Sequence, residues 1–131
     1  MPEYTWDHTH IRTYDVPGTA AWLQDKLGAS NVEGTKVSEA RADLLLGGTK
    51  VIVTQVKEGD GINPTPAIPY AGFEHFGLGV RDLDKVAAEL KAKGVEFTRE
   101  PVTARPGLRI CFIRSPQGIS IELLERDAKY A

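Results

Sequence analysis

The chain has 131 residues, of which 41% are hydrophobic and 26% charged, and its formal net charge is −2. This length favours one compact domain with a buried core, and the interspersed charges argue against nucleic-acid binding. The single cysteine, Cys111, excludes an internal disulfide framework and is typical of a reducing compartment. We therefore expect a cytoplasmic protein without a signal peptide or a membrane span.

Two segments of the sequence repeat one pattern at an offset of 67 residues (75 − 8). The first is "HTHIRTYD", His8–Asp15, and the second is "HFGLGVRD", His75–Asp82. Each begins with a histidine, alternates like a strand and ends at an aspartate. The repeat predicts two modules of the same construction.

A helix is predicted after each of these strands, over residues 15–28 and 82–94. Asp15 and Asp82 are suited to cap the helix N-termini, and Gly28 and Gly94 are suited to end the helices in a left-handed conformation. Apolar residues recur on one face of each helix, as expected for packing against a sheet. They are Ala20, Leu23 and Leu27 in the first helix and Leu83, Val86, Ala87 and Leu90 in the second.

Three further strands are predicted in each half, over residues 30–37, 40–46 and 50–56, and over residues 96–100, 108–113 and 119–125. Between the halves, residues 57–72 contain Gly and Pro at close intervals and are predicted to form a linker. The predicted fold class is α+β, with two βαβββ modules over about residues 5–56 and 73–126.

These motifs, together with the ending "SPQGISIELLE" at residues 115–125, resemble those of the vicinal oxygen chelate superfamily. This superfamily includes glyoxalase I, methylmalonyl-CoA epimerase, extradiol dioxygenases and bleomycin-resistance proteins. Ser115 stands where the family signature has Asp. The resemblance covers nearly all of residues 1–131 as a single domain. It implies a half-open, barrel-like cleft made by two paired modules, a divalent metal at the floor of the cleft, and a homodimer. The two modules that form the cleft belong either to one chain or to two.

Strand alternation places the candidate metal ligands on polar faces. His8, His10 and Arg12 share one side of the first strand, and Glu122 lies opposite the apolar series of the last strand. A carboxylate within an apolar strand is costly unless something neutralises it. We expect His8, His75 and Glu122 to bind one divalent ion of Fe, Mn, Co, Ni or Zn, with positions left for water or substrate.

The fourth ligand position is open to several interpretations. An ungapped offset of 67 residues pairs Gln55 with Glu122 and resembles one form of the epimerase site. A three-residue gap pairs Ile52 with Glu122 instead, and an isoleucine cannot ligate a metal. His10 or a water molecule is then the candidate for that position.

Other polar residues are candidates for handling the substrate. Glu122 and His10 are candidate catalytic acids or bases, and Glu74 is a further candidate for moving a proton. Arg12 and Arg109 are candidates for holding an anionic substrate, because a guanidinium binds a carboxylate through two hydrogen bonds. The alternative for both arginines is an exposed charge on a strand.

Three functions fit this sequence. The leading prediction is a metal-dependent isomerase or lyase that acts on a small oxo- or hydroxy-acid or a thioester, with the metal stabilising an enolate. The alternatives are a non-haem Fe(II) extradiol-type dioxygenase and a non-catalytic small-molecule or drug-binding protein of the bleomycin-resistance type. The expected partners are a small-molecule substrate and a second copy of the chain, with no nucleic acid and no membrane.

Overall fold

A computed structural model describes residues 3–128 of the protein. The chain divides into two compact units, residues 1–63 and 64–131, and the boundary falls within the predicted linker. All residues between Gln55 and His75 are described, and they form no helix or strand.

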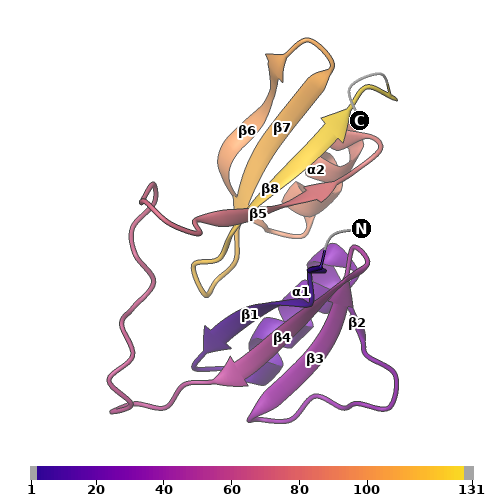
Figure 1. Ribbon diagram of the computed structural model, residues 1–131. Coiled ribbons are helices and arrows are strands. Elements are labelled where there is room, and N and C mark those ends of the chain that lie inside the picture. Colours follow the sequence, from indigo (N-terminus) through magenta and orange to yellow (C-terminus); the bar gives the residue numbers. More distant parts are fainter. Residues whose placement is uncertain (1–2, 129–131) are drawn as a thin grey trace. The chain divides into compact units, whose positions relative to one another are not determined.

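The first unit contains one helix and a four-stranded sheet. In chain order its elements are β1 (His8–Thr13), α1 (Val16–Leu27), β2 (Ser30–Asn31), β3 (Arg41–Leu46) and β4 (Thr49–Gln55) (Figure 1). The strand order is β1-β4-β3-β2, with β1 parallel to β4 and the other pairs antiparallel. The strand predicted over residues 30–37 is much shorter, because the chain turns away after Asn31 through Gly34, whose φ is 81°.

The second unit repeats this order with β5 (His75–Gly79), α2 (Leu83–Ala92), β6 (Glu96–Arg105), β7 (Leu108–Arg114) and β8 (Ser120–Arg126) (Figure 1). Its strand order is β5-β8-β7-β6, with β5 parallel to β8. The matching orders confirm the predicted α+β class and the two βαβββ modules. Within the described residues neither sheet closes on itself.

Both helices begin and end where the sequence indicates. The carboxylate of Asp15 accepts a hydrogen bond from the Gly18 N–H at 3.0 Å, and the carboxylate of Asp82 accepts one from the Lys85 N–H at 3.2 Å. Each bond satisfies one N–H that has no partner within the helix. Gly28 and Gly94 follow the helices with φ of 74° and 78°. Among the described residues, no helix has the length and apolar character needed to cross a membrane.

Each helix packs across one face of its own sheet and buries that face (Figure 1). Burial of this kind stabilises the fold by roughly 25 cal/mol for each Å² of apolar surface removed from water. The opposite face of each sheet carries the polar residues of β1, β5 and β8. The core includes Ile11, Val16, Ala20, Leu23, Leu44 and Val53 in the first unit and Leu83, Ala87, Leu90, Ile113, Ile121 and Leu123 in the second.

Candidate metal centre

Glu122 lies on the face of the second sheet that turns away from α2. Its neighbours in β8, Ile121 and Leu123, are fully buried, and alternation therefore directs Glu122 to the other side. The parallel register sets Glu122 beside Gly77 of β5, and the antiparallel register sets it beside Phe112 of β7. The side chain of Glu122 is 18% exposed.

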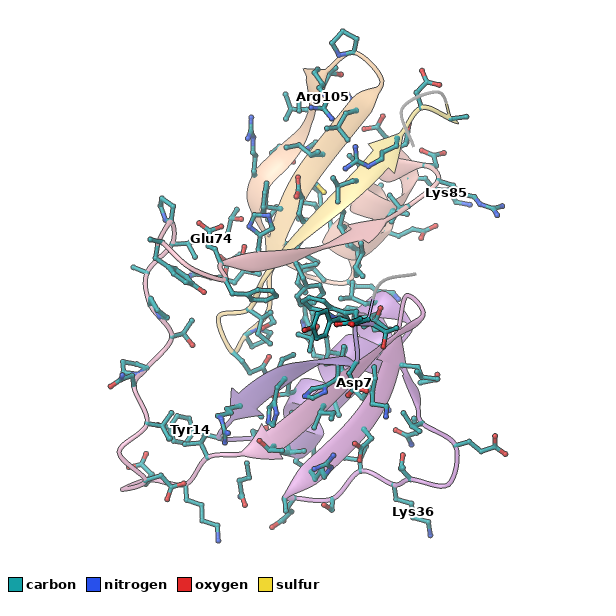
Figure 2. The ribbon with its side chains drawn as sticks, viewed as in Figure 1. Asp7, Tyr14, Lys36, Glu74, Lys85 and Arg105 are labelled. Atoms are coloured by element: carbon teal, nitrogen blue, oxygen red, sulfur yellow. The ribbon has the colours of Figure 1, made fainter. Side chains whose placement is uncertain are left out.

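His75 lies between two carboxylates. Its Nε2 is 3.3 Å from Glu122 Oε1, and its Nδ1 is 2.8 Å from Glu74 Oε1. The ring packs edge-on against Phe112, with 4.9 Å between the ring centroids. The second unit thus brings together two of the three predicted ligands. Glu74, which precedes β5, is labelled in Figure 2.

The spacing of these two side chains fits a shared ion. Two ligand atoms, each about 2.0–2.2 Å from one ion, lie about 3.0–3.5 Å apart. The Nε2 to Oε1 distance of 3.3 Å falls within this interval. Among the described residues, no three or more His, Cys, Asp or Glu side chains form a group that could hold a metal ion by themselves.

His8 and His10 lie on the polar face of the first sheet. His8 Nδ1 is 2.7 Å from Asp7 Oδ2, and His10 Nε2 is 2.7 Å from Thr54 Oγ1, with 6.0 Å between the two ring centroids. The hydrogen bond to His8 lowers the pKa of Asp7. Partial burial lowers the pKa of His10, and the positive charge of Arg12 adds to that effect. His8, His10 and Arg12 are exposed, whereas Ile11 and Thr13 between and after them are buried. The three side chains thus share one face of β1, as alternation predicts.

The strand registers decide between the two alignments at the fourth ligand position. His10 and Gly77 occupy equivalent positions in the two copies of the repeat. His10 of β1 pairs with Ile52 of β4. Gly77 of β5 pairs with Glu122 of β8. Ile52 is therefore the counterpart of Glu122. Gln55 lies three residues further along β4, so it points to the opposite face of the sheet. The registers therefore agree with the gapped alignment, in which Ile52 and not Gln55 corresponds to Glu122.

Arg109 lies on the face of the second sheet opposite to that of Glu122. Phe112 pairs with Glu122, so Arg109, three residues away along β7, faces the helix side of the sheet. There its guanidinium donates to Asp84 Oδ1 of α2 at 2.7 Å and to Thr103 Oγ1 of β6 at 3.0 Å. Arg109 links the helix to the sheet and does not lie beside Glu122, and its role in holding an anionic substrate stays a prediction.

Sequence reasoning missed Arg114, which lies on the same face as Glu122. Arg114 pairs with Ser120 in β8, and its Nε is 3.4 Å from Glu96 Oε2. Alternation from Phe112 would have found it, given the register of β7 and β8. A pocket of about 570 Å³ opens on this face. It is lined by Ile68, Pro69, Glu74, Glu96, Thr98, Arg99, Phe112, Arg114 and Ser120.

The fold is thus a duplicated βαβββ architecture, with an imidazole and a carboxylate paired on the face of the second sheet that is opposite to α2. The sequence profile of the Glyoxalase/Bleomycin resistance protein/Dioxygenase superfamily matches residues 5–123, and the chain belongs to this superfamily. The resemblance inferred from the motifs is confirmed.

Curated relatives match part of the chain. A protein named "Probable lactoylglutathione lyase, chloroplastic" from Arabidopsis thaliana is 47% identical over 57 residues, which are 43% of this chain and 16% of that protein. A protein named "Probable lactoylglutathione lyase" from Synechocystis sp. is 36% identical over 59 residues, 44% of this chain and 45% of that protein. The match thus spans less than half of either relative's length.

Solved structures of similar fold cover nearly the whole chain. SMU.1112c has a TM-score of 0.75 at 19% identity, covering 95% of this chain and all of that one. The fosfomycin resistance protein FosX from Listeria monocytogenes has a TM-score of 0.72 at 17% identity, covering 96% of both chains. TioX from Micromonospora sp. ML1 has a TM-score of 0.68 at 18% identity, covering 95% of this chain and 98% of that one. At these identities the likeness concerns the fold.

Proposed function

We propose that the protein is a divalent-metal-dependent lyase or isomerase of the glyoxalase type. The pairing of His75 Nε2 with Glu122 Oε1 at 3.3 Å is the observation on which the proposal rests, because it presents two ligand atoms at the spacing of a shared ion. The similarity to lactoylglutathione lyases over parts of the chain supports the reaction class. The proposed substrate is a small oxo- or hydroxy-acid or a thioester.

The proposed ligands are His8, His75 and Glu122, with one or more positions left for water or substrate. The bound ion would supply a Lewis acid that polarises a substrate oxygen and so acidifies the adjacent carbon–hydrogen bond. Nitrogen and carboxylate ligands suit Fe, Mn, Co, Ni or Zn.

The chain's own residues would bind the substrate and move its proton. Glu122 has a second carboxylate oxygen in addition to the one that faces His75, and this oxygen is available to accept a proton and return it to the neighbouring carbon. His10, on the face of His8, is the proposed alternative base. Arg114 and Arg12 are the proposed contacts for an anionic group of the substrate, because each lies on the polar face of its sheet.

Metal loading and turnover test this proposal together. Purified protein is stripped with a chelator, reloaded with Ni²⁺, Co²⁺ or Zn²⁺ without oxygen, and assayed for formation of S-lactoylglutathione and for proton exchange in small 2-oxo and 2-hydroxy acids. We expect about one ion per chain and turnover that depends on it, with loss of both in His75→Ala and Glu122→Gln. Wild-type protein that takes up no divalent ion would contradict the proposal.

Ile52 favours an oxygenase as the second candidate function. An isoleucine in the position equivalent to Glu122 offers no ligand and leaves coordination positions free, as a non-haem Fe(II) centre requires for substrate and O₂. The same assay separates the two candidates. An isomerase works with Ni²⁺ or Co²⁺ in the absence of O₂, whereas an extradiol dioxygenase requires both Fe²⁺ and O₂.

We also propose that the protein acts as a homodimer, as the family resemblance implies. A mass of twice 14.3 kDa by light scattering is the expected result. A monomer that retains metal-dependent turnover would contradict this assembly.

A further inference from the structure

The repeat extends one residue beyond the two histidines, to the acidic residue that precedes each of them. Asp7 and Glu74 are 67 positions apart (74 − 7), as are His8 and His75. Asp7 Oδ2 lies 2.7 Å from Nδ1 of His8, and Glu74 Oε1 lies 2.8 Å from Nδ1 of His75. The two units thus present the same acid–histidine arrangement (Asp7 and Glu74 are labelled in Figure 2).

The third histidine of the chain differs from these two. His10 follows Thr9, and it is Nε2, not Nδ1, that meets a partner, the Thr54 hydroxyl at 2.7 Å. Within the described part of the first unit, no hydrogen bond reaches Nε2 of His8. The two proposed ligands therefore share a feature that the remaining histidine lacks: the carboxylate of the preceding residue contacts Nδ1. Nε2 of His75 faces Glu122 instead.

The chemistry of the partners determines where the ring proton lies. A carboxylate accepts hydrogen bonds and cannot donate them, so the neutral ring of His8 carries its proton on Nδ1. Both ring nitrogens of His75 face carboxylates, and the shorter distance, 2.8 Å from Nδ1 to Glu74 against 3.3 Å from Nε2 to Glu122, favours the proton on Nδ1. The lone pair is then on Nε2, and the negative charge behind the ring makes Nε2 a better metal ligand. In the second unit this places Nε2 and Glu122 Oε1, two electron-rich atoms, 3.3 Å apart. Only a cation or a proton between them makes that approach favourable.

We infer that Asp7 and Glu74 are positioning residues, which fix the Nδ1–H tautomer of His8 and His75 and direct Nε2 toward a divalent ion. This inference rests on the proposed function for its ion, but the tautomer itself is a property of the metal-free protein. Glu74 has the larger role of the two, because its side chain is 24% exposed and that of Asp7 is 80% exposed. Solvent competes more strongly for the exposed hydrogen bond.

The first experiment measures the ring tautomers directly in metal-free protein. With three histidines in the chain, two-dimensional long-range ¹H–¹⁵N spectra at alkaline pH, where imidazoles are neutral, resolve each ring. We expect Nδ1–H for His8 and His75, and a shift toward the Nε2–H form of the affected ring in Asp7→Asn or Glu74→Gln. An Nε2–H form in wild-type protein, or a tautomer that neither variant changes, would overturn the inference, whether or not the protein binds a metal.

The second experiment measures metal affinity by competition with a chromophoric chelator for Zn²⁺ and Co²⁺. We expect Glu74→Gln to weaken binding by about 10–100-fold, the usual effect of removing a carboxylate behind a ligating histidine. Asp7→Asn should weaken it by less, and Glu74→Asp, which keeps the carboxylate, should lose less affinity than Glu74→Gln. The matched controls, Glu96→Gln and Asp43→Asn, each remove one negative charge from the polar face of one sheet without touching a histidine.

The outcomes separate this inference from the proposed function. Wild-type protein that binds the ion, with both positioning variants binding it equally well, overturns the inference and leaves the proposed function standing. Equal losses in the variants and in their charge controls also overturn it, because the effect would then be general electrostatic attraction. Wild-type protein that binds no ion contradicts the proposed function. The tautomer spectra then still decide whether Asp7 and Glu74 position the histidine rings.

Discussion

Ile52 occupies in the first sheet the position that Glu122 occupies in the second. Each lies beside the residue two places after the repeat histidine, His10 in one case and Gly77 in the other. The duplication therefore supplies two equivalent imidazoles and only one carboxylate. The asymmetry predicts a centre with fewer protein ligands than positions around the ion, which leaves room for a substrate to bind it directly.

Substituting Ile52→Glu should restore the missing ligand. We expect this variant to be less stable without metal by about 1–3 kcal/mol, since Ile52 is only 8% exposed and a buried carboxylate is costly. Adding Zn²⁺ or Co²⁺ should raise its melting temperature by more than that of the wild type, because binding to the native state stabilises it by mass action. Gln55→Glu, on the opposite face of the same strand, is the control and should show no added response to metal.

Glu122→Gln should reduce metal affinity and lower kcat by at least about 100-fold, because the amide is a weaker ligand and a poor base. The fold should persist, since Glu122 is not part of the packed core. Metal content, turnover and thermal unfolding are measured on the same sample. Glu100→Gln is the control, because this exposed side chain pairs with Lys91 away from His75. A Glu122→Gln variant with undiminished metal content would remove Glu122 from the ligand set.

The two arginines of β7 should respond differently to substitution. Arg109→Ala removes the contacts to Asp84 and Thr103, so it should lower the free energy of unfolding by about 1 kcal/mol and leave KM unchanged. Arg114→Ala should raise KM for an anionic substrate with little change in stability, because Arg114 lies on the face of Glu122. Denaturant unfolding and steady-state kinetics check both. The reverse pattern would return the substrate contact to Arg109.

The predictions that succeeded rest on local signals. The repeat histidines, the capping residues Asp15 and Asp82, and the terminal glycines act within one or two turns of the chain, so the sequence alone locates the helices and the first strand of each module. Strand ends were less predictable. β6 extends through Pro101 to Arg105 because it is an edge strand with register shifts, where a missing N–H is tolerated.

The faces on which Gln55 and Arg109 lie depend on how one strand pairs with another. Alternation states which residues of a strand share a face, but it does not state which face of the next strand they meet. Gln55 was nominated by an offset that ignores the longer turn before β8, and Arg109 by its place in a strand whose pairing with β8 was unknown. The acid–histidine arrangement was visible as Asp7–His8 and Glu74–His75 in the sequence, but its meaning required the hydrogen bonds at Nδ1.

Cys111 should be unreactive in the folded protein. Its side chain is fully buried, and burial raises the pKa of the thiol to about 11. A thiol reagent at pH 8 should therefore label native protein far more slowly than unfolded protein, because the thiolate is the reacting form.

The raised pKa of the Cys111 thiol also predicts that the free energy of unfolding falls as the pH becomes alkaline. Above about pH 9 the unfolded thiol loses its proton while the native thiol retains it, so the loss grows to about 2 kcal/mol by pH 11. Cys111→Ala should abolish this part of the pH dependence, and equal slopes for the variant and the wild type would contradict the assignment.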